Sequence, residues 1–220
     1  MKKSYNHTNA FTMIELVIVI AVLGILAALA IPRIQRDRTQ EAADTILSDI
    51  RYTQHMALND FKENPRKNKW QRSFWQIQIE SCANNSGLFV TIGSDLDYGG
   101  DIAKTEATLD PINLKPMFWV NTQDCSDGGD DTVSSNVFLT TKFGVSSITT
   151  TGGCAGVKRI GFDHLGRPHV SFSSSTTPDY STIMTSTCTM TFSMEGDTDN
   201  FSINIEPETG YAYIVNQNAS

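Results

Sequence analysis

The sequence predicts an α+β fold in which a long N-terminal helix packs on a head made of an antiparallel β-sheet or sandwich. Two observations lead to this prediction. An apolar stretch near the N-terminus runs directly into an amphipathic helical pattern. The rest of the chain consists of short apolar runs separated by turn residues, with no helical pattern between them, which is typical of antiparallel sheets.

Composition sets the class of protein before any motif is considered. The chain has 220 residues, of which 40% are hydrophobic and 19% charged, and its formal net charge is −7. This balance excludes a disordered tail and a multi-span membrane protein. The acidic charge also argues against a protein devoted to nucleic acid, because domains that bind a polyanion are normally basic.

The apolar stretch covers residues 11–31, and Glu15 is its only ionisable side chain. A helix of this length spans roughly 32 Å, about the hydrocarbon thickness of a bilayer. Three interpretations compete. The stretch is a secretory signal cleaved after Ala28-Leu29-Ala30, a plain single-span anchor, or a segment that is cut in front of the apolar run and stays on the mature protein.

The third interpretation is favoured by the residues NA-FTMIELVIVIAVLGILAALAIP, which resemble the N-terminus of type IV pilins and pseudopilins. The resemblance implies that a prepilin peptidase cuts between Ala10 and Phe11 and that Phe11 is then N-methylated. Glu15 and Pro32 match the Glu and the Pro of the family pattern. Ala10 departs from the Gly usual before the cut, which bears on the efficiency of processing rather than on its site.

Glu15 is the candidate assembly residue. A carboxylate within an apolar span costs about 2.5–3.5 kcal/mol on insertion scales, so its presence there points to a function. In the family this Glu is thought to pair with the N-terminal amine of a neighbouring subunit, and the resemblance implies that Glu15 does the same. The competing interpretation is a Glu that only stabilises the start of the helix.

An amphipathic helix is expected to continue over residues 32–64. Pro32 should kink it, because proline removes one helical hydrogen bond. The turn residues Asn64-Pro65 should end it. Apolar residues recur along it at spacings of three, four and seven and form one stripe: Ala43, Ile46, Leu47, Ile50, Ala57, Leu58 and Phe61.

The head, residues 65–220, is expected to hold eight or nine strands. The expected strands are 74–79, 88–92, 117–120, 137–140, 157–162, 170–172, 189–192, 201–205 and 211–215. The segments IGFDHLGRP and INIEPETGYAYI resemble the C-terminal domain of minor pseudopilins of type II secretion. Gly166 and Gly210 would then be turn positions that need a positive φ.

Four cysteines lie beyond the apolar stretch, at positions 82, 125, 154 and 188. An even number in an exported β domain favours two disulfides and an oxidising periplasm. The pairing of sequence neighbours, Cys82 with Cys125 and Cys154 with Cys188, is our expectation among three possible pairings. A zinc site is the rival interpretation, but the spacings do not match a metal finger.

Catalytic and cofactor motifs were not found, so no enzyme activity, cofactor or metal is expected. His164 and His169 flank a predicted turn and are interpreted as a polar hairpin tip. The acidic loop with Asp124, Asp127, Asp130 and Asp131 could supply oxygen ligands to Ca²⁺, but it does not match an EF-hand and is better interpreted as a solvated loop.

One basic cluster is interleaved with aromatic residues, as in surfaces that bind single-stranded nucleic acid. Its residues are Lys62, Arg66, Lys67, Lys69 and Arg72. Residues 76–220 hold 6 basic and 17 acidic side chains, a net charge of −11 that would repel a long polyanion. DNA is therefore the less favoured partner, and a solvated connector or a docking surface for an acidic neighbouring subunit is preferred.

Together these features predict a non-enzymatic minor pilin or minor pseudopilin of a type IV pilus or type II secretion pseudopilus. Residues 1–10 would be the leader, 11–31 the transmembrane and filament-core helix, 32–64 the amphipathic helix and 65–220 the head. Its partners would be other pilin subunits, the prepilin peptidase and the bacterial inner membrane. The head would lie in the periplasm and later in the filament. The alternative is a membrane-anchored binding protein that uses the basic cluster and does not polymerise.

Overall fold

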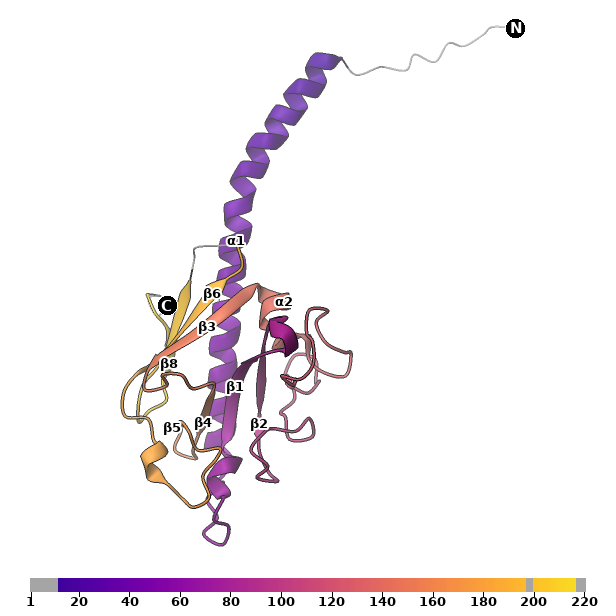
Figure 1. The fold of residues 1–220 in the computed structure, drawn as a ribbon. Helices are drawn as coiled ribbons and strands as arrows, with labels where there is room; N and C mark the ends of the chain where they lie inside the picture. Colours follow the sequence, from indigo (N-terminus) through magenta and orange to yellow (C-terminus); the bar gives the residue numbers. More distant parts are fainter. Residues whose placement is uncertain (1–11, 197–199, 217–220) are drawn as a thin grey trace, which may run out of the picture. The chain divides into compact units, whose positions relative to one another are not determined.

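The computed structural model describes residues 12–196 and 200–216, and for residues 27–37 it gives the helical backbone alone. The expected leader, residues 1–10, lies outside the described residues. The chain divides into two compact units, Met1–Asp37 and Arg38–Ser220, which are described separately. Figure 1 shows the order of the elements along the chain. The fold is α+β, as expected: an N-terminal helix followed by antiparallel sheets, neither of which is closed.

Helix α1 (Met13–Leu58) is one continuous helical element of 46 residues, and its backbone remains helical past Pro32. The kink expected at Pro32 stays a prediction. The helix ends earlier than expected, because Nδ2 of Asn59 donates to the carbonyl oxygen of His55 at 2.7 Å and caps the last turn. Leu58 and Phe61 are 52% and 64% exposed, so placing them in the buried stripe was wrong.

Four strands form the first sheet, and every neighbouring pair is antiparallel. In spatial order they are β2 (Leu88–Ser94), β1 (Trp75–Ser81), β4 (Arg159–Phe162) and β5 (Pro168–His169). Ile77 in the centre of β1 pairs with Ile92 of β2 and Ile160 of β4, and all three are buried. The strand expected at 170–172 is instead the two-residue β5, just before it.

The second sheet is also antiparallel and has four strands in sequence order. They are β3 (Val145–Gly152), β6 (Cys188–Met194), β7 (Phe201–Ile205) and β8 (Ala212–Ile214). Strands β6 and β7 alternate strictly between buried and half-buried residues, which is the period-two pattern that predicted them. Strand β3 was not predicted, because half of its residues are exposed Ser and Thr.

The described part of the head also contains five short helices, two of which replace one predicted strand. They are η1 (Trp70–Ser73), η2 (Ala83–Asn85), η3 (Ser135–Val137), α2 (Leu139–Phe143) and η4 (Tyr180–Thr182). The strand expected at 137–140 is wrong. Oγ of Ser134 caps η3 by accepting from the N–H of Asn136, and Gly144 ends α2 at φ 77°. The segment 117–120 forms no strand, so that prediction is also wrong.

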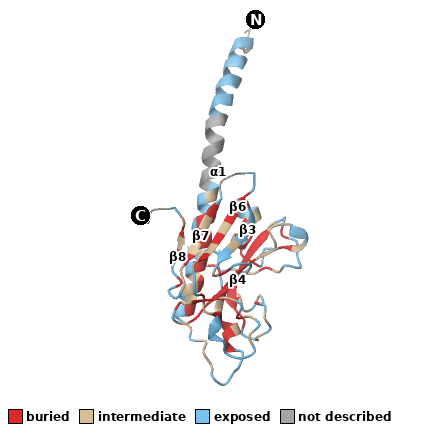
Figure 2. Cartoon of the chain, turned by 60° about the vertical axis from the view of Figure 1, so that its left-hand side comes forward, coloured by how far each residue is buried: buried red, intermediate tan, exposed pale blue. Residues whose placement is uncertain are grey.

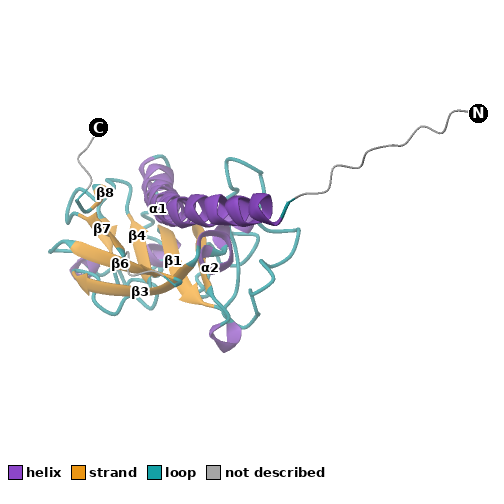
Figure 3. Ribbon diagram, turned by 90° about the horizontal axis from the view of Figure 1, so that it is seen from above, coloured by secondary structure: helices purple, strands orange, loops and turns teal. Residues whose placement is uncertain are grey.

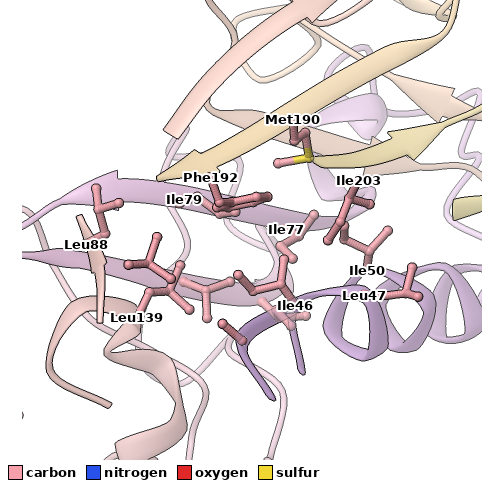
Figure 4. Close-up of a cluster of buried hydrophobic side chains, with 14 of the residues drawn as sticks. Ile46, Leu47, Ile50, Ile77, Ile79, Leu88, Leu139, Met190, Phe192 and Ile203 are labelled. Carbon is pink, nitrogen blue, oxygen red and sulfur yellow. The ribbon is translucent and has the colours of Figure 1, made fainter. Parts of the chain in front are cut away.

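The core of the Arg38–Ser220 unit lies where α1 meets both sheets (Figure 4). Ile46 and Ile50 of α1 are at most 1% exposed and pack near Ile77 of β1 and Phe192 of β6. Seen from above, α1 lies on one side of the sheets and β3 on the opposite side (Figure 3). The apolar stripe of α1, which was expected to be the buried face of the helix, therefore forms one side of the core.

Two disulfides tie the loops to this core. They join Cys82 to Cys125, 43 residues apart, and Cys154 to Cys188, 34 residues apart. This is the pairing of sequence neighbours that was expected, and no free cysteine is present in the described residues. The second bridge fastens the loop after β3 to the first residue of β6, and the first fastens the long loop after β2 to the end of β1.

Candidate functional site

Glu15 forms a capping box at the start of α1. Its Oε2 accepts hydrogen bonds from the backbone N–H of Thr12 at 3.0 Å and from Oγ1 of Thr12 at 2.9 Å. In return, the N–H of Glu15 donates to Oγ1 of Thr12 at 3.3 Å. This reciprocal arrangement satisfies donors that have no partner inside the helix. Both bonds to the carboxylate use Oε2, and within the described part of the chain Oε1 accepts none.

Residues 16–26, which follow Glu15, are apolar and all exposed (Figure 2). They include Leu16 at 59%, Ile20 at 58% and Leu26 at 57% exposure. A helix that is apolar all round is normally covered by something else. Among the described residues, no helix combines the length and mean hydropathy of a membrane span.

The structure gives little on the other N-terminal candidates, Ala10, Phe11 and Pro32. Ala10 and Phe11 lie outside the described residues. Pro32 belongs to the part of α1 for which the structure gives the helical backbone alone. The processing role of the first two and the assembly role of Pro32 therefore remain proposals.

Gln54 of α1 holds together two turns that the sequence predicted separately. Its Nε2 donates to the carbonyl oxygen of Gly166 at 2.9 Å and to that of Thr209 at 2.8 Å. Gly166 and Gly210 have φ values of 78° and 65°, as the turn prediction required. A Cβ on Gly210 would lie 2.3 Å from the carbonyl oxygen of Gly166. The two turns thus fit only with glycine at this contact.

Asp163 organises the turn that contains Gly166. Its carboxylate accepts from the N–H groups of Leu165 and Arg167 at 3.0 and 2.9 Å, and from Nε of Arg167 at 2.7 Å. Burial alone would raise the pKa of Asp163, but hydrogen bonds from His169 and Arg167 and the charge of Arg167 lower it to about 2. The buried His169 thus belongs to a structural network with Asp163 rather than to the polar hairpin tip that was expected for it.

Asp49 is another carboxyl group of the head whose pKa is shifted. It lies on α1, and its Oδ2 is buried with no hydrogen-bond partner among the described residues. Burial, with a smaller contribution from the charge of Asp110, raises the pKa of Asp49 to about 8. Unlike Oδ2 of Asp49, Oδ2 of Asp110 has partners: it accepts hydrogen bonds from the side chains of Ser134, Asn113 and Asn136. The sequence gives no signal for this pair, since the two residues are 61 positions apart.

The basic cluster is partly committed to the fold. Arg72 donates to the carbonyl oxygens of Tyr98, Ser174 and Ser175 at 2.9–3.1 Å. Lys62 pairs with Asp60 at 2.6 Å. The remaining cations, Arg66, Lys67 and Lys69, lie on the exposed connector.

The aromatic side chains beside the cluster are largely unavailable for stacking on bases. Trp70 and Phe74 are 4% and 2% exposed and form a small buried cluster with Phe172. Nε1 of Trp75 donates to Oδ2 of Asp60 at 2.9 Å, and only Phe61 presents most of its ring to solvent. The alternation of basic and aromatic residues in the sequence therefore reflects packing at this point.

The acidic loop is folded on its own turns. Asp124 accepts from the N–H of Ser126 at 2.8 Å, and Asp130 accepts from the N–H of Thr132 at 2.7 Å. Within the part of the chain that the structure describes, the carboxylates of Asp95, Asp97 and Glu106 lie within 4.8 Å of one another, a cluster that no sequence motif indicated. Their oxygens accept N–H groups of their own loop, such as that of Gly100 to Asp95 at 2.8 Å.

One family model matches the chain, the prokaryotic N-terminal methylation motif, over residues 5–31. No curated protein matches the chain. No solved structure matches it either. The matched motif belongs to structural pilin-type proteins rather than to an enzyme class, and it indicates a protein that is anchored in a membrane or exported. Residues 5–31 thus carry the prepilin signal of the type IV pilins and pseudopilins, with Glu15 inside it.

Proposed function

We propose that this protein is a non-enzymatic structural subunit, a minor pilin or minor pseudopilin, of a type IV pilus or a type II secretion pseudopilus. The observation that carries the proposal is the methylation motif at residues 5–31, which includes Glu15 and an exposed apolar helical surface. The head that follows holds two disulfides, which fits export to an oxidising compartment.

Assembly would start with cleavage between Ala10 and Phe11. The cut creates an α-amino group at Phe11, and the amine of one subunit would pair with Glu15 of its neighbour. Oε1 of Glu15 is available for this contact, since Oε2 takes both bonds from Thr12. Pairing the two charges matters because an unpaired charge in an apolar bundle is costly.

The apolar surface of residues 13–26 would provide most of the driving force. Side chains that are half to two thirds exposed in the single chain would be covered first by the inner membrane and then by neighbouring helices in the filament. The head would lie in the periplasm before assembly. The choice between a minor pilin and a minor pseudopilin rests on the C-terminal segments around Gly166 and Gly210 and on their resemblance to minor pseudopilins.

The alternative, an anchored binding protein that uses the basic cluster, has less support. Three of the five cations already have partners within the head: Lys62 pairs with Asp60, Arg72 donates to backbone carbonyl oxygens, and Nζ of Lys67 lies 5.2 Å from the ring centroid of Tyr98. The connector as a docking surface for an acidic subunit remains compatible with the proposal, because Arg66, Lys67 and Lys69 stay exposed.

The test is to replace Glu15 with Ala in cells and to measure processing and filament incorporation separately. We expect Glu15→Ala protein to be cleaved normally and to stay in the membrane fraction, with at least tenfold less in the sheared filament fraction. Glu41→Ala, which removes an exposed acid further along α1, is the matched control and should assemble normally. Equal incorporation of the Glu15→Ala and Glu41→Ala proteins would contradict the proposal.

A further inference from the structure

A cavity of about 580 Å³ lies between strand β3 and the first sheet, within the Arg38–Ser220 unit. Its apolar lining includes Ile77 and Ile79 of β1, Ile160 of β4 and Met190 of β6. Ser and Thr side chains of β3 form much of the rest. The cavity thus joins an apolar floor to a polar strand, a combination found where proteins bind ligands.

Strand β3 is the edge of its sheet, and among the described residues no strand pairs with it on the side opposite β6. The N–H of Gly153 donates to the carbonyl oxygen of Thr187, which fixes the alternation of hydrogen bonds along the β3–β6 pair. By that alternation Thr149 and Thr151 bond to β6, whereas the backbone groups of Ile148 and Thr150 point away from it. Both Ile148 and Thr150 line the cavity.

The backbone groups at this edge have no partner in the described part of the chain. No backbone hydrogen bond joins Ile148 or Thr150 to a loop or turn. Unpaired edge groups of this kind are a template for an additional strand. The apolar floor beside them provides space for a side chain of that strand.

Opposite charges mark the two ends of the cavity. Glu195 lies at the Ser146 end, where its N–H donates to the carbonyl oxygen of Gly144 at 2.7 Å. Lys158 lies at the other end, where Oγ1 of Thr150 donates to the carbonyl oxygen of its neighbour Val157. Neither Glu195 nor Lys158 forms an ion pair within the described residues. A strand with a basic residue at one end and an acidic residue at the other would complement both.

We propose that the free edge of β3 and the adjoining cavity bind an extended peptide segment of a partner protein as a fifth strand. In the antiparallel arrangement the segment presents an acidic side chain to Lys158, an apolar side chain beside Ile148 and a basic side chain to Glu195. The partner is a different protein rather than a second copy, because residues 76–220 carry a net charge of −11 and two such heads repel each other.

The test uses the full chain in detergent micelles and the peptide acetyl-Glu-Thr-Val-Thr-Lys-amide. Amide NMR shifts are followed as the peptide is added to millimolar concentration. We expect saturable shifts at Ile148 and Thr150. The same peptide N-methylated at Val loses the hydrogen bond that the Val N–H donates to the carbonyl oxygen of Ile148. It should bind at least about fivefold more weakly, since one such bond contributes roughly 1 kcal/mol. The peptide with Glu and Lys exchanged should also bind more weakly.

A protein variant tests the same edge from the other side. Thr150→Pro removes the outward N–H without breaking a bond to β6, and should abolish binding. The backbone N–H of Thr149 faces β6, so the Thr149→Val protein should bind the peptide as tightly as the parent does. If Thr150→Pro does not fold, the comparison of the two peptides still decides.

Three results would overturn the proposal: no shift at Ile148 and Thr150, equal affinity for the N-methylated peptide, or self-association of the parent that Thr150→Pro abolishes. The last result would assign the edge to a second copy.

Discussion

Replacing Asp49 with Asn should remove the loss of stability that Asp49 causes in the head as pH rises from about 4 to 8. In the folded chain burial holds the pKa of Asp49 at about 8, whereas an unfolded chain has the ordinary value of 3.8. Over this interval the folded state keeps a proton that the unfolded state has lost. Stability therefore falls as pH rises through this interval, and the loss is complete above the folded pKa.

The size of the effect follows from the same pKa difference. One proton of difference corresponds to about 1.4 kcal/mol per pH unit, so Asp49 should lower the free energy of unfolding by roughly 3 kcal/mol between pH 5 and pH 7. Asn has the shape of the protonated carboxyl group but does not ionise. The free energy of unfolding of the Asp49→Asn protein should therefore rise relative to that of the parent by roughly 3 kcal/mol between pH 5 and pH 7.

The assay is denaturant unfolding of the full chain in detergent, followed by tryptophan fluorescence, because Trp70 and Trp119 are 4% and 8% exposed and report on the head. Asp44→Asn, which removes an exposed acid five positions earlier on α1, should follow the parent at every pH. Parallel stability curves for the parent and the Asp49→Asn protein would refute the assignment of a buried, protonated Asp49.

Three further substitutions test the contacts of the head by the same unfolding assay. Gln54→Ala removes both hydrogen bonds to the C-terminal turns and should cost about 1–3 kcal/mol; an unchanged midpoint would contradict the bridging role. Asp163→Asn removes the ion pair with Arg167 and should destabilise the protein at pH 7 by about 1–3 kcal/mol. This difference in stability should shrink as pH falls from about 4 through 2, because the folded protein then protonates Asp163, whose pKa is lowered. A difference that stays constant over this range would contradict the lowered pKa of Asp163. Replacing Cys154 and Cys188 together by Ser should cost about 2–5 kcal/mol, and no loss of stability would show that the bridge constrains little.

The sequence predicted those elements in which a periodic pattern and the buried face coincide. The α1 stripe at Ile46 and Ile50 is buried as expected, and strands β6 and β7 follow their period-two alternation. Both features depend on local spacing, which a single sequence contains. The cysteine pairing agrees with the expected one, but the sequence left three pairings open.

The elements that were missed or wrong depend on solvent exposure and on capping. Strand β3 has an exposed, Ser- and Thr-rich surface because it lies at a sheet edge, so its residues do not alternate in polarity. The segment 137–140 looks apolar enough for a strand, but the cap at Ser134 and the left-handed Gly144 favour short helices. Leu58 and Phe61 continue the helical spacing beyond the point where Asn59 ends the helix.

Of the candidate site, sequence reasoning identified the residues but not their contacts. Glu15 was singled out as the lone acid of the apolar stretch, whereas its bonds to Thr12 are visible only in the folded helix start. The meeting of the two C-terminal turns at Gln54 joins residues more than 110 positions apart, and no local pattern predicts such a contact.

The most direct test of the account is the mass of the native protein extracted from membranes. If the prepilin signal at residues 5–31 acts as proposed, the intact mass and the N-terminal peptide will correspond to a chain that begins with N-methylated Phe11 and retains the apolar helix. A chain that begins after Ala30, or one that still begins at Met1, would contradict it, because neither product has the free amine four residues before Glu15 on which assembly depends.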